Sequence, residues 1–226
     1  HFAATTAGIK EDASVKEIVD NYSNNDIDFH KTVADMAGIS RLQAKTINLG
    51  LFYGMGKAKL QAELGLSTKQ EAEELFNKYH ERVPFVRDLM NETSRWASRE
   101  GEIRTLLGRG CRFNKWEPAQ FGMHTPMTWE DAMKKYGENR IRRAFTYKAL
   151  NKLIQGSAAD MTKKSMLDLY KEGIIAHIQI HDELDISVES DKKAERIIEI
   201  MEAAVDLEVP NKVDYESGKT WGNIYD

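Results

Sequence analysis

Three side chains that can bind metal ions or phosphates stand in a row at His181, Asp182 and Glu183. Apolar and polar residues alternate on both sides of them, which predicts two half-buried strands that meet in a hairpin over residues 175–188. Neighbouring side chains on an extended backbone point to opposite faces, so only one of the two carboxylates can face a given ion. A site with two metal ions would therefore need a further carboxylate from another part of the chain. Taken alone, the cluster also fits an ordinary polar turn.

A second set of side chains recurs every four residues within a helix predicted over residues 40–54. The set consists of Arg41, Lys45, Leu49 and Tyr53. Four residues advance a helix by about 400°, so these side chains form one slowly drifting stripe. Two cations can hold a triphosphate through charge-assisted hydrogen bonds of ~1.5–3 kcal/mol each, and the apolar and aromatic side chains suit a base. The alternative is a surface helix whose Leu49 and Tyr53 reach the core.

The helix that carries this stripe has its own boundary signals. Ser40 and Gln43 predict a capping box at its first turn, and Gly54 ends it. The rest of the pattern predicts helices over residues 16–22, 31–37, 68–81, 85–99 and 191–205, a strand with a glycine turn over 102–110, a loop-rich excursion over 113–138, and a closing strand over 209–214.

A longer helix, predicted over residues 138–170, carries Asn151 and Gln155 on one face. Gly156 and Ser157 follow directly, and such small residues allow another segment to pack closely or the helix to kink.

Composition limits the class of protein. The chain has 226 residues, of which 41% are hydrophobic and 30% charged, enough for one large domain or two lobes that share a core. No apolar run approaches the ~20 residues needed to cross a bilayer, and no charged-then-apolar leader opens the chain. The single Cys111 cannot form an internal disulfide. We therefore expect a cytoplasmic protein without membrane contact.

The charge is unevenly distributed along the chain. Residues 104–164 hold 13 Lys and Arg against 5 Asp and Glu, a net charge of +8, whereas residues 1–103 carry −3 and residues 165–226 carry −9. The aromatic residues that interrupt the basic block are Trp116, Phe121, Trp129, Phe145 and Tyr147. Such a segment can follow a phosphate backbone, although an ordinary solvated basic face has the same composition.

Three motifs occur in an order and at separations that resemble one enzyme family. They are Arg41-x3-Lys45-x7-Tyr53-Gly54, then Asn151-x3-Gln155-Gly156-Ser157-Ala158-Ala159-Asp160, then His181-Asp182-Glu183. Together they resemble the fingers and palm of family A (polymerase-I-like) DNA polymerases, from Asp28 to Trp221-Gly222. The Asp28-Phe29-His30 run and residues 48–54 look most like bacteriophage members.

The resemblance implies an α+β fold, in which a mostly helical fingers subdomain stands on an incomplete palm with a small antiparallel β-sheet. Residues 1–100 would form the fingers-like region, with the nucleotide-binding helix 40–54. Residues 101–226 would form the palm-like region, with a template- and primer-contacting helix 138–170 and a catalytic hairpin 175–188. The basic block would hold the phosphates of primer-template DNA.

The resemblance also implies residue roles in the addition of deoxynucleoside triphosphates to a primer 3′ end. Asp182 would bind two Mg²⁺ ions, with Glu183 near the primer end. Lys45 would be both a catalytic proton donor and a ligand of the triphosphate. The other nucleotide-binding residues would be His30, Arg41, Leu49 and Tyr53. The DNA-binding residues would be Tyr53, Gly54, Asn151, Gln155 and His181, the two amides reading minor-groove acceptors.

One family motif is absent from the sequence. The first catalytic aspartate of the family lies in an Asp-x-Ser-x-x-Glu-like strand ahead of the triphosphate-binding helix, and no such motif occurs between His1 and Arg41. One principal metal ligand would then come from an upstream polymerase segment or chain. We expect a partner at the open edge that a missing palm strand would leave, and no activity from the isolated chain.

Three functions from different classes remain open on the sequence. The first is the C-terminal portion of a DNA-directed DNA polymerase in DNA replication. The second is a non-catalytic nucleic-acid-binding fragment with the polymerase fold. The third is an unrelated metal-dependent phosphotransferase or a structural helical protein.

Overall fold

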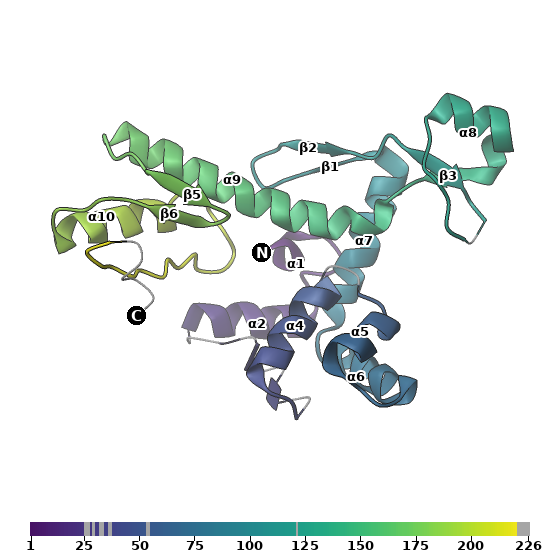
Figure 1. Cartoon of the computed structure of the whole chain (residues 1–226), viewed down its shortest axis with the longest axis horizontal. Coiled ribbons are helices and arrows are strands. Elements are labelled where there is room, and N and C mark those ends of the chain that lie inside the picture. Colours follow the sequence, from purple (N-terminus) through teal and green to yellow (C-terminus); the bar gives the residue numbers. More distant parts are fainter. Residues whose placement is uncertain are drawn as a thin grey trace. The chain divides into compact units, whose positions relative to one another are not determined.

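The computed structural model describes residues 1–24, 28, 30–31, 34–35, 38–52, 55–120 and 122–220. Among these residues, helices dominate, and the strands form three separate two-stranded antiparallel ribbons (Figure 1). The chain divides into two compact units, residues 1–157 and residues 158–226. Within the described ranges, no helix is long and apolar enough to cross a membrane.

The first unit contains most of the helices. Their bounds are α1 Phe2–Thr5, α2 Ala13–Asn24, α4 Arg41–Phe52, α5 Lys57–Leu64, α6 Lys69–Arg82, α7 Pro84–Glu100 and α8 Trp129–Tyr136, with short 3-10 turns at η1 Glu138–Arg140 and η2 Thr146–Lys148. Helix α9, Ala149–Lys171, begins in this unit and ends in the second.

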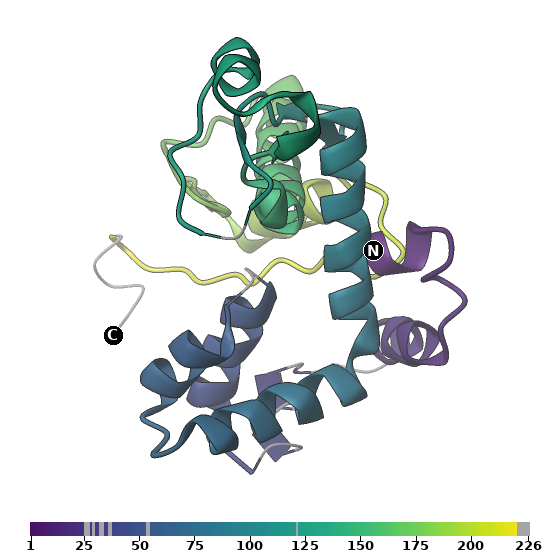
Figure 2. The same ribbon diagram turned by 90° about the vertical axis from the view of Figure 1, so that its right-hand side faces the viewer.

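Helices α6 and α7 follow their predicted bounds closely because the signals at their ends are strong. The Thr68 side chain accepts a hydrogen bond from the Glu71 N–H, Pro84 occupies the first turn of α7, and Gly101 ends α7 with a φ of 74°. Figure 2 shows the two helices as rods that meet at a bend.

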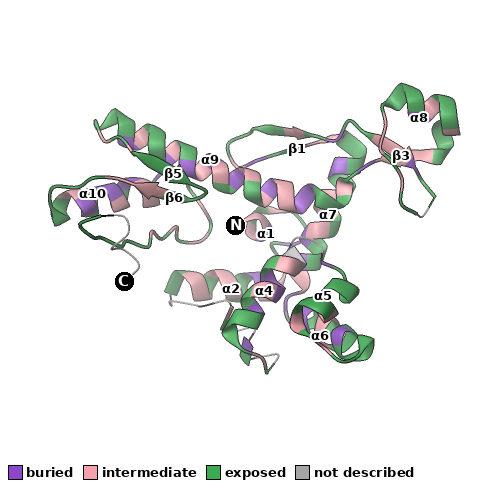
Figure 3. Cartoon of the chain, in the orientation of Figure 1, coloured by how far each residue is buried: buried purple, intermediate pink, exposed green. Residues whose placement is uncertain are grey.

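Helix α7 supports two apolar clusters in the first unit. Its Leu89 and Ala97 pack with α2, the strand after α7 and the start of α9, whereas its Val86 packs with α4, α5 and α6. Figure 3 shows the buried residues as narrow stripes along these helices. The helix that carries the predicted nucleotide stripe is therefore fixed to α7 through a core of its own.

The ribbons pair in simple antiparallel register. Strand β1, Glu102–Arg104, pairs with β2, Gly110–Arg112, and β3, Trp116–Pro118, pairs with β4, Ile141–Arg143. In the second unit, β5, Ile178–Ile180, pairs with β6, Glu183–Asp185. The predicted α+β class and the hairpin within residues 175–188 are thus confirmed.

The second unit covers only one face of its ribbon. Leu184 and Ile186 pack on an apolar cluster formed by Leu169 of α9 and by α10, Asp191–Glu202. Ile178 and Ile180 remain 45% and 39% exposed. The prediction that the first strand is half-buried is therefore wrong for the described residues, because its apolar side chains lie on the uncovered face.

Three other sequence predictions need correction. The helix predicted over residues 138–170 begins only at Ala149, because residues 138–148 form η1, β4 and η2, and Phe145 has a left-handed φ of 64°. The excursion over residues 113–138 contains β3 and α8, whose Thr128 side chain accepts from the Asp131 N–H. Residues 209–214 form no strand, and the helix predicted over 31–37 lies partly outside the described residues.

Candidate functional site

Helix α4 begins with the predicted capping box. The Gln43 N–H donates to Ser40 Oγ at 3.2 Å, and the Ser40 N–H donates to Gln43 Oε1 at 3.0 Å. Ala44 and Ile47 of the same helix are buried at 0% and 1% exposure. The cap and the buried face together fix how the opposite face is presented.

The exposed face of α4 carries the predicted stripe. Arg41, Lys45 and Leu49 are all exposed, Leu49 at 43%. The alternative in which Leu49 packs in the core is therefore wrong. Tyr53 and Gly54, which would continue the stripe, lie outside the described residues.

Arg41 already has an acidic partner. Its guanidinium forms an ion pair with the Asp28 carboxylate, and Asp28 also accepts a hydrogen bond from the Lys31 N–H at 3.0 Å. These two donors, the guanidinium first, hold the pKa of Asp28 below its usual value. Lys45, by contrast, has no carboxylate within 4.0 Å among the described residues. Of the two cations on the stripe, Lys45 is therefore the one whose charge is not paired with a carboxylate in the described part of the chain.

His30 is held by a residue that the sequence analysis did not select. The Asn48 side-chain amide donates to His30 Nδ1 at 2.9 Å, and Asn48 itself is 1% exposed. This bond leaves the neutral ring's proton on Nε2, where it can be donated to a phosphate. A polar residue on the core face of α4 was the signal that could have identified Asn48.

Helix α9 presents its two amides beside a tightly packed segment. Asn151 is half-buried and Gln155 is exposed. A Cβ atom on Gly156 would lie 2.7 Å from the Thr105 side chain, and Ser157 Oγ accepts from the Leu106 N–H at 2.9 Å. The close approach that the sequence indicated at Gly156 and Ser157 is confirmed.

The basic block is only partly available to a ligand. Arg142 pairs with Glu117 at 2.9 Å, and Arg143 donates to the Phe113 carbonyl and lies over the Trp116 ring. Several exposed cations of the block have no carboxylate in bridging range in the described part of the chain: Lys115, Lys134, Lys135, Arg140, Lys148 and Lys163.

The hairpin tip belongs to the second unit. His181 and Asp182 are its two central residues, and only His181 has a positive φ, 52°, as in a type II′ turn. Gln179 Nε2 donates to the His181 carbonyl at 2.7 Å. His181, Asp182 and Glu183 are all exposed. The tip therefore presents its carboxylate to solvent on a two-residue turn.

These carboxylates suit Mg²⁺ as part of a site. Carboxylate oxygens are the ligands that Mg²⁺ prefers, and the ion commonly uses one or two of them together with phosphates and water. No group of three or more His, Cys, Asp or Glu that could hold a metal ion occurs among the described residues. Asp182, which the sequence predicts as the metal ligand, is thus of the right chemistry for one ligand of a metal site, and this role stays a prediction.

Residues 9–223 match the family model described as DNA polymerase family A. The chain belongs to this family. A DNA-directed DNA polymerase of Pseudomonas phage M6 is 34% identical over 93% of the chain and 33% of its own length, and DNA polymerase I of Bacillus caldotenax is 33% identical over 95% of the chain and 24% of its own length.

A solved structure, the POL domain of Pol1 from M. smegmatis in complex with DNA primer-template and dNTP, matches with a TM-score of 0.71 and 25% identity. The match covers 92% of this chain and 36% of the chain in that structure. The resemblance to family A polymerases, phage members included, is confirmed. The family A chain spans about a third or less of the length of these relatives.

Proposed function

We propose that this chain is the C-terminal fingers and palm portion of a DNA-directed DNA polymerase that extends a primer during DNA replication, in the cytoplasm of a bacterial host if the gene is phage-encoded. The observation that carries the proposal is the exposed stripe of Arg41, Lys45 and Leu49 on a capped helix whose opposite face is buried. The family match and the relative solved with primer-template DNA and dNTP support the same function.

The residues of α4 would bind and orient the triphosphate. Lys45 can donate a hydrogen bond and then a proton to the leaving pyrophosphate, and the His30 Nε2–H can donate to a phosphate oxygen. Arg41 would add a guanidinium whose position Asp28 fixes. Leu49 would contact the sugar and base, with Tyr53 near the templating base.

The hairpin and α9 would hold the primer end. Asp182 would hold Mg²⁺, and Glu183 would lie near the primer terminus. Two bound Mg²⁺ ions would supply activation of the primer hydroxyl and stabilisation of the leaving group. Asn151, Gln155 and His181 would contact the DNA, and the exposed cations of residues 115–148 would contact its phosphates.

A further polymerase segment would complete this portion. The uncovered face of the β5–β6 ribbon carries Ile178 and Ile180. Because the ribbon has only two strands, the outer edge of each strand has no partner strand within the ribbon. An upstream strand that carries an aspartate would pair with one of these edges and add the missing metal ligand.

Primer extension with and without an added upstream polymerase fragment tests the proposal. We expect extension by the mixture and none by the chain alone. Binding of primer-template without extension by the mixture would instead support the non-catalytic fragment. Template-independent phosphatase activity would support the unrelated phosphotransferase.

A further inference from the structure

Asn48 is a polar residue on the buried face of α4. Its side chain is 1% exposed, and its neighbours on that face, Ala44 and Ile47, are apolar. A buried amide loses its hydration, and hydrogen bonds within the protein have to compensate for that loss. Among the described residues, the Asn48 side chain has one such bond, from Nδ2 to His30 Nδ1 at 2.9 Å, whereas its Oδ1 is buried without a partner. The bond to His30 is therefore the feature that distinguishes this amide from an apolar side chain of the same size.

Two contacts hold the residues before α4 along this helix. Asp28 pairs with Arg41, and His30 pairs with Asn48, seven residues further along the helix. Seven residues are close to two full turns, so both contacts lie on one side of α4. Lys45 lies between them, about one turn from Asn48. The His30 ring is thereby placed on the side of the helix that carries the two cations of the stripe.

The bond from Asn48 decides which nitrogen of His30 carries the proton. An amide NH2 group can only donate, so His30 Nδ1 has to accept, and the proton of the neutral ring is then on Nε2. In the reverse tautomer Nε2 would present a lone pair, and it could not donate to a phosphate oxygen, which is itself an acceptor. Only the tautomer that Asn48 selects adds a hydrogen-bond donor to those of Arg41 and Lys45.

We propose that Asn48 is a positioning residue, which fixes the Nε2–H tautomer and the orientation of the His30 ring so that this ring donates to the triphosphate. Asn48 itself does not touch the nucleotide, and none of the roles proposed above is assigned to it. The fixed tautomer is a property of this chain alone, whereas its effect on nucleotide binding rests on the proposed function.

Nitrogen-15 NMR of the imidazole rings tests the tautomer in the 226-residue chain, without DNA or nucleotide. At pH 8, where an imidazole is ordinarily neutral, the His30 signals should show a proton on Nε2 and none on Nδ1. The spectrum of His30→Gln assigns these signals among those of the six histidines. A proton on Nδ1 of the unmodified chain, or an average of the two tautomers, would overturn the proposal.

An isosteric replacement reverses the polarity of the bond. Asn48→Asp keeps the shape of the side chain, but a carboxylate only accepts, so Nδ1 of His30 should gain a proton. Asn48→Leu removes the bond, should leave an average of the two tautomers, and serves alone if the buried carboxylate prevents folding. Asn91→Leu removes an exposed amide from α7 and is the control, which should keep Nδ1 bare. A bare Nδ1 that persists in the folded Asn48 variants would contradict the role of Asn48.

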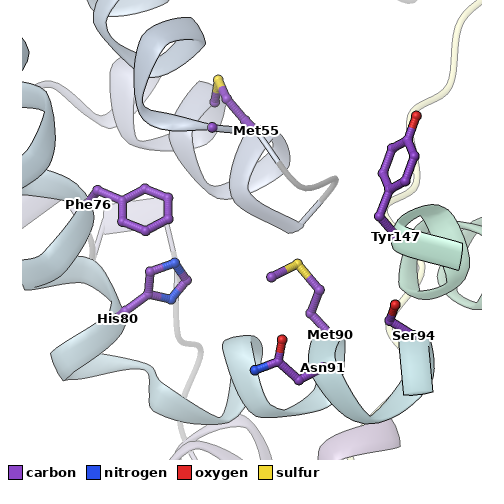
Figure 4. Close-up of a pocket in the computed structure, with 8 residues that line it drawn as sticks. Met55, Phe76, His80, Met90, Asn91, Ser94 and Tyr147 are labelled. Atoms are coloured by element: carbon purple, nitrogen blue, oxygen red, sulfur yellow. The ribbon is translucent and has the colours of Figure 1, made fainter. Parts of the chain in front are cut away.

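His80 is an internal reference in the same spectra. It is buried at 5% exposure on α6, and its ring meets the Phe76 ring edge-on, with centroids 4.5 Å apart (Figure 4). Phe76 packs against the apolar cluster that includes Ala44 and Ile47 of α4. A general disturbance of that core would therefore change the signals of His80. We expect the Asn48 variants to change the His30 signals and to leave those of His80 in place.

A double-mutant cycle measures what the fixed tautomer does for nucleotide binding. In the polymerase reconstituted with its upstream segment, Asn48→Leu should raise the Kd for the incoming nucleotide roughly tenfold, the value of one charge-assisted hydrogen bond, with a smaller effect on the maximal rate. Single-turnover nucleotide addition separates the two quantities. Because Asn48 acts through His30, Asn48→Leu should cause no further loss in a His30→Ala background.

Two outcomes of the cycle are informative in different ways. A further tenfold loss in the double variant would show that Asn48 supports the helix rather than His30, and would overturn the positioning role. If the reconstituted chain fails to extend a primer at all, the proposed function fails, whereas the NMR spectra still decide whether Asn48 fixes the tautomer of His30.

Discussion

Helix α4 and the β5–β6 ribbon carry the two halves of the proposed chemistry, and they are supported very differently. The helix has a reciprocal cap and a face buried at 0–1% exposure in Ala44 and Ile47, so residues of its own unit position its stripe. The ribbon has one covered face and two exposed isoleucines. The proposed triphosphate contacts could therefore be preorganised within this chain, whereas the proposed metal-binding tip would need support from another segment.

The largest expected effect is at the hairpin tip. In the polymerase reconstituted with its upstream segment, Asp182→Asn should slow primer extension by more than roughly 10³-fold, because it removes a metal ligand rather than one hydrogen bond. Single-turnover nucleotide addition measures this. Asp206→Asn, an exposed change in the same unit, should have no effect. If the rate of nucleotide addition by the Asp182→Asn variant stays within about tenfold of the unmodified enzyme, Asp182 binds no catalytic metal ion.

The next effect is on α4. Lys45→Ala should slow nucleotide addition by roughly 10²–10³-fold, the cost of losing one preorganised donor on developing charge. The same single-turnover assay applies, with Lys59→Ala on the neighbouring helix as a control of equal charge. If the two alanine variants behave alike, the stripe does not face the triphosphate.

A smaller effect is expected one turn further along α4. Family A enzymes usually place Phe or Tyr where this chain has Leu49, and the exposed position allows a longer side chain. Leu49→Tyr should speed incorporation and raise the acceptance of dideoxynucleotides roughly fivefold, the equivalent of one hydrogen bond of about 1 kcal/mol from the phenolic hydroxyl. The ratio of dideoxy to deoxy incorporation measures it, and Leu49→Phe supplies the ring without the hydroxyl. An unchanged ratio of dideoxy to deoxy incorporation would mean that Leu49 does not contact the incoming nucleotide.

The smallest effect concerns the support of α4 itself. Ser40→Ala removes the cap and should lower the free energy of unfolding by about 1 kcal/mol. Urea unfolding measures the change, and Ser98→Ala within α7 should be nearly neutral because that residue caps no helix. A Ser40→Ala variant as stable as the unmodified chain would mean that the buried face alone positions the helix.

The sequence predicted elements well where local signals and burial agree. The predicted bounds of α6 and α7 agree with the structure because Thr68, Pro84 and Gly101 mark the ends of these helices locally, and the ribbon tip followed from alternation around His181 and Asp182. The helix ends and the hairpin turn both depend on residues that are close in sequence, so the amino-acid sequence alone is enough to predict them.

The errors arose where structure depends on distant residues. Strands β3 and β4, which the sequence did not predict, have only three residues each. The closing strand predicted over residues 209–214 met no pairing strand in the part of the chain that is described. Helix α8 was hidden by nearby prolines, although Thr128 and Asp131 gave a usable capping signal. The predicted roles of the site residues remain predictions, whereas the Asp28–Arg41 and His30–Asn48 contacts needed coordinates to be seen.

The contact at Gly156 has a mechanical consequence. Thr105 fills the space that any side chain at Gly156 would need, Ser157 accepts from the Leu106 N–H, and Arg109 donates to the Gly156 carbonyl at 2.7 Å. The β1–β2 turn and the first half of α9 are thereby joined at three adjacent points. The turn and this half of the helix should therefore move together. If a bound strand displaced the turn, the helix that presents Asn151 and Gln155 would shift with it.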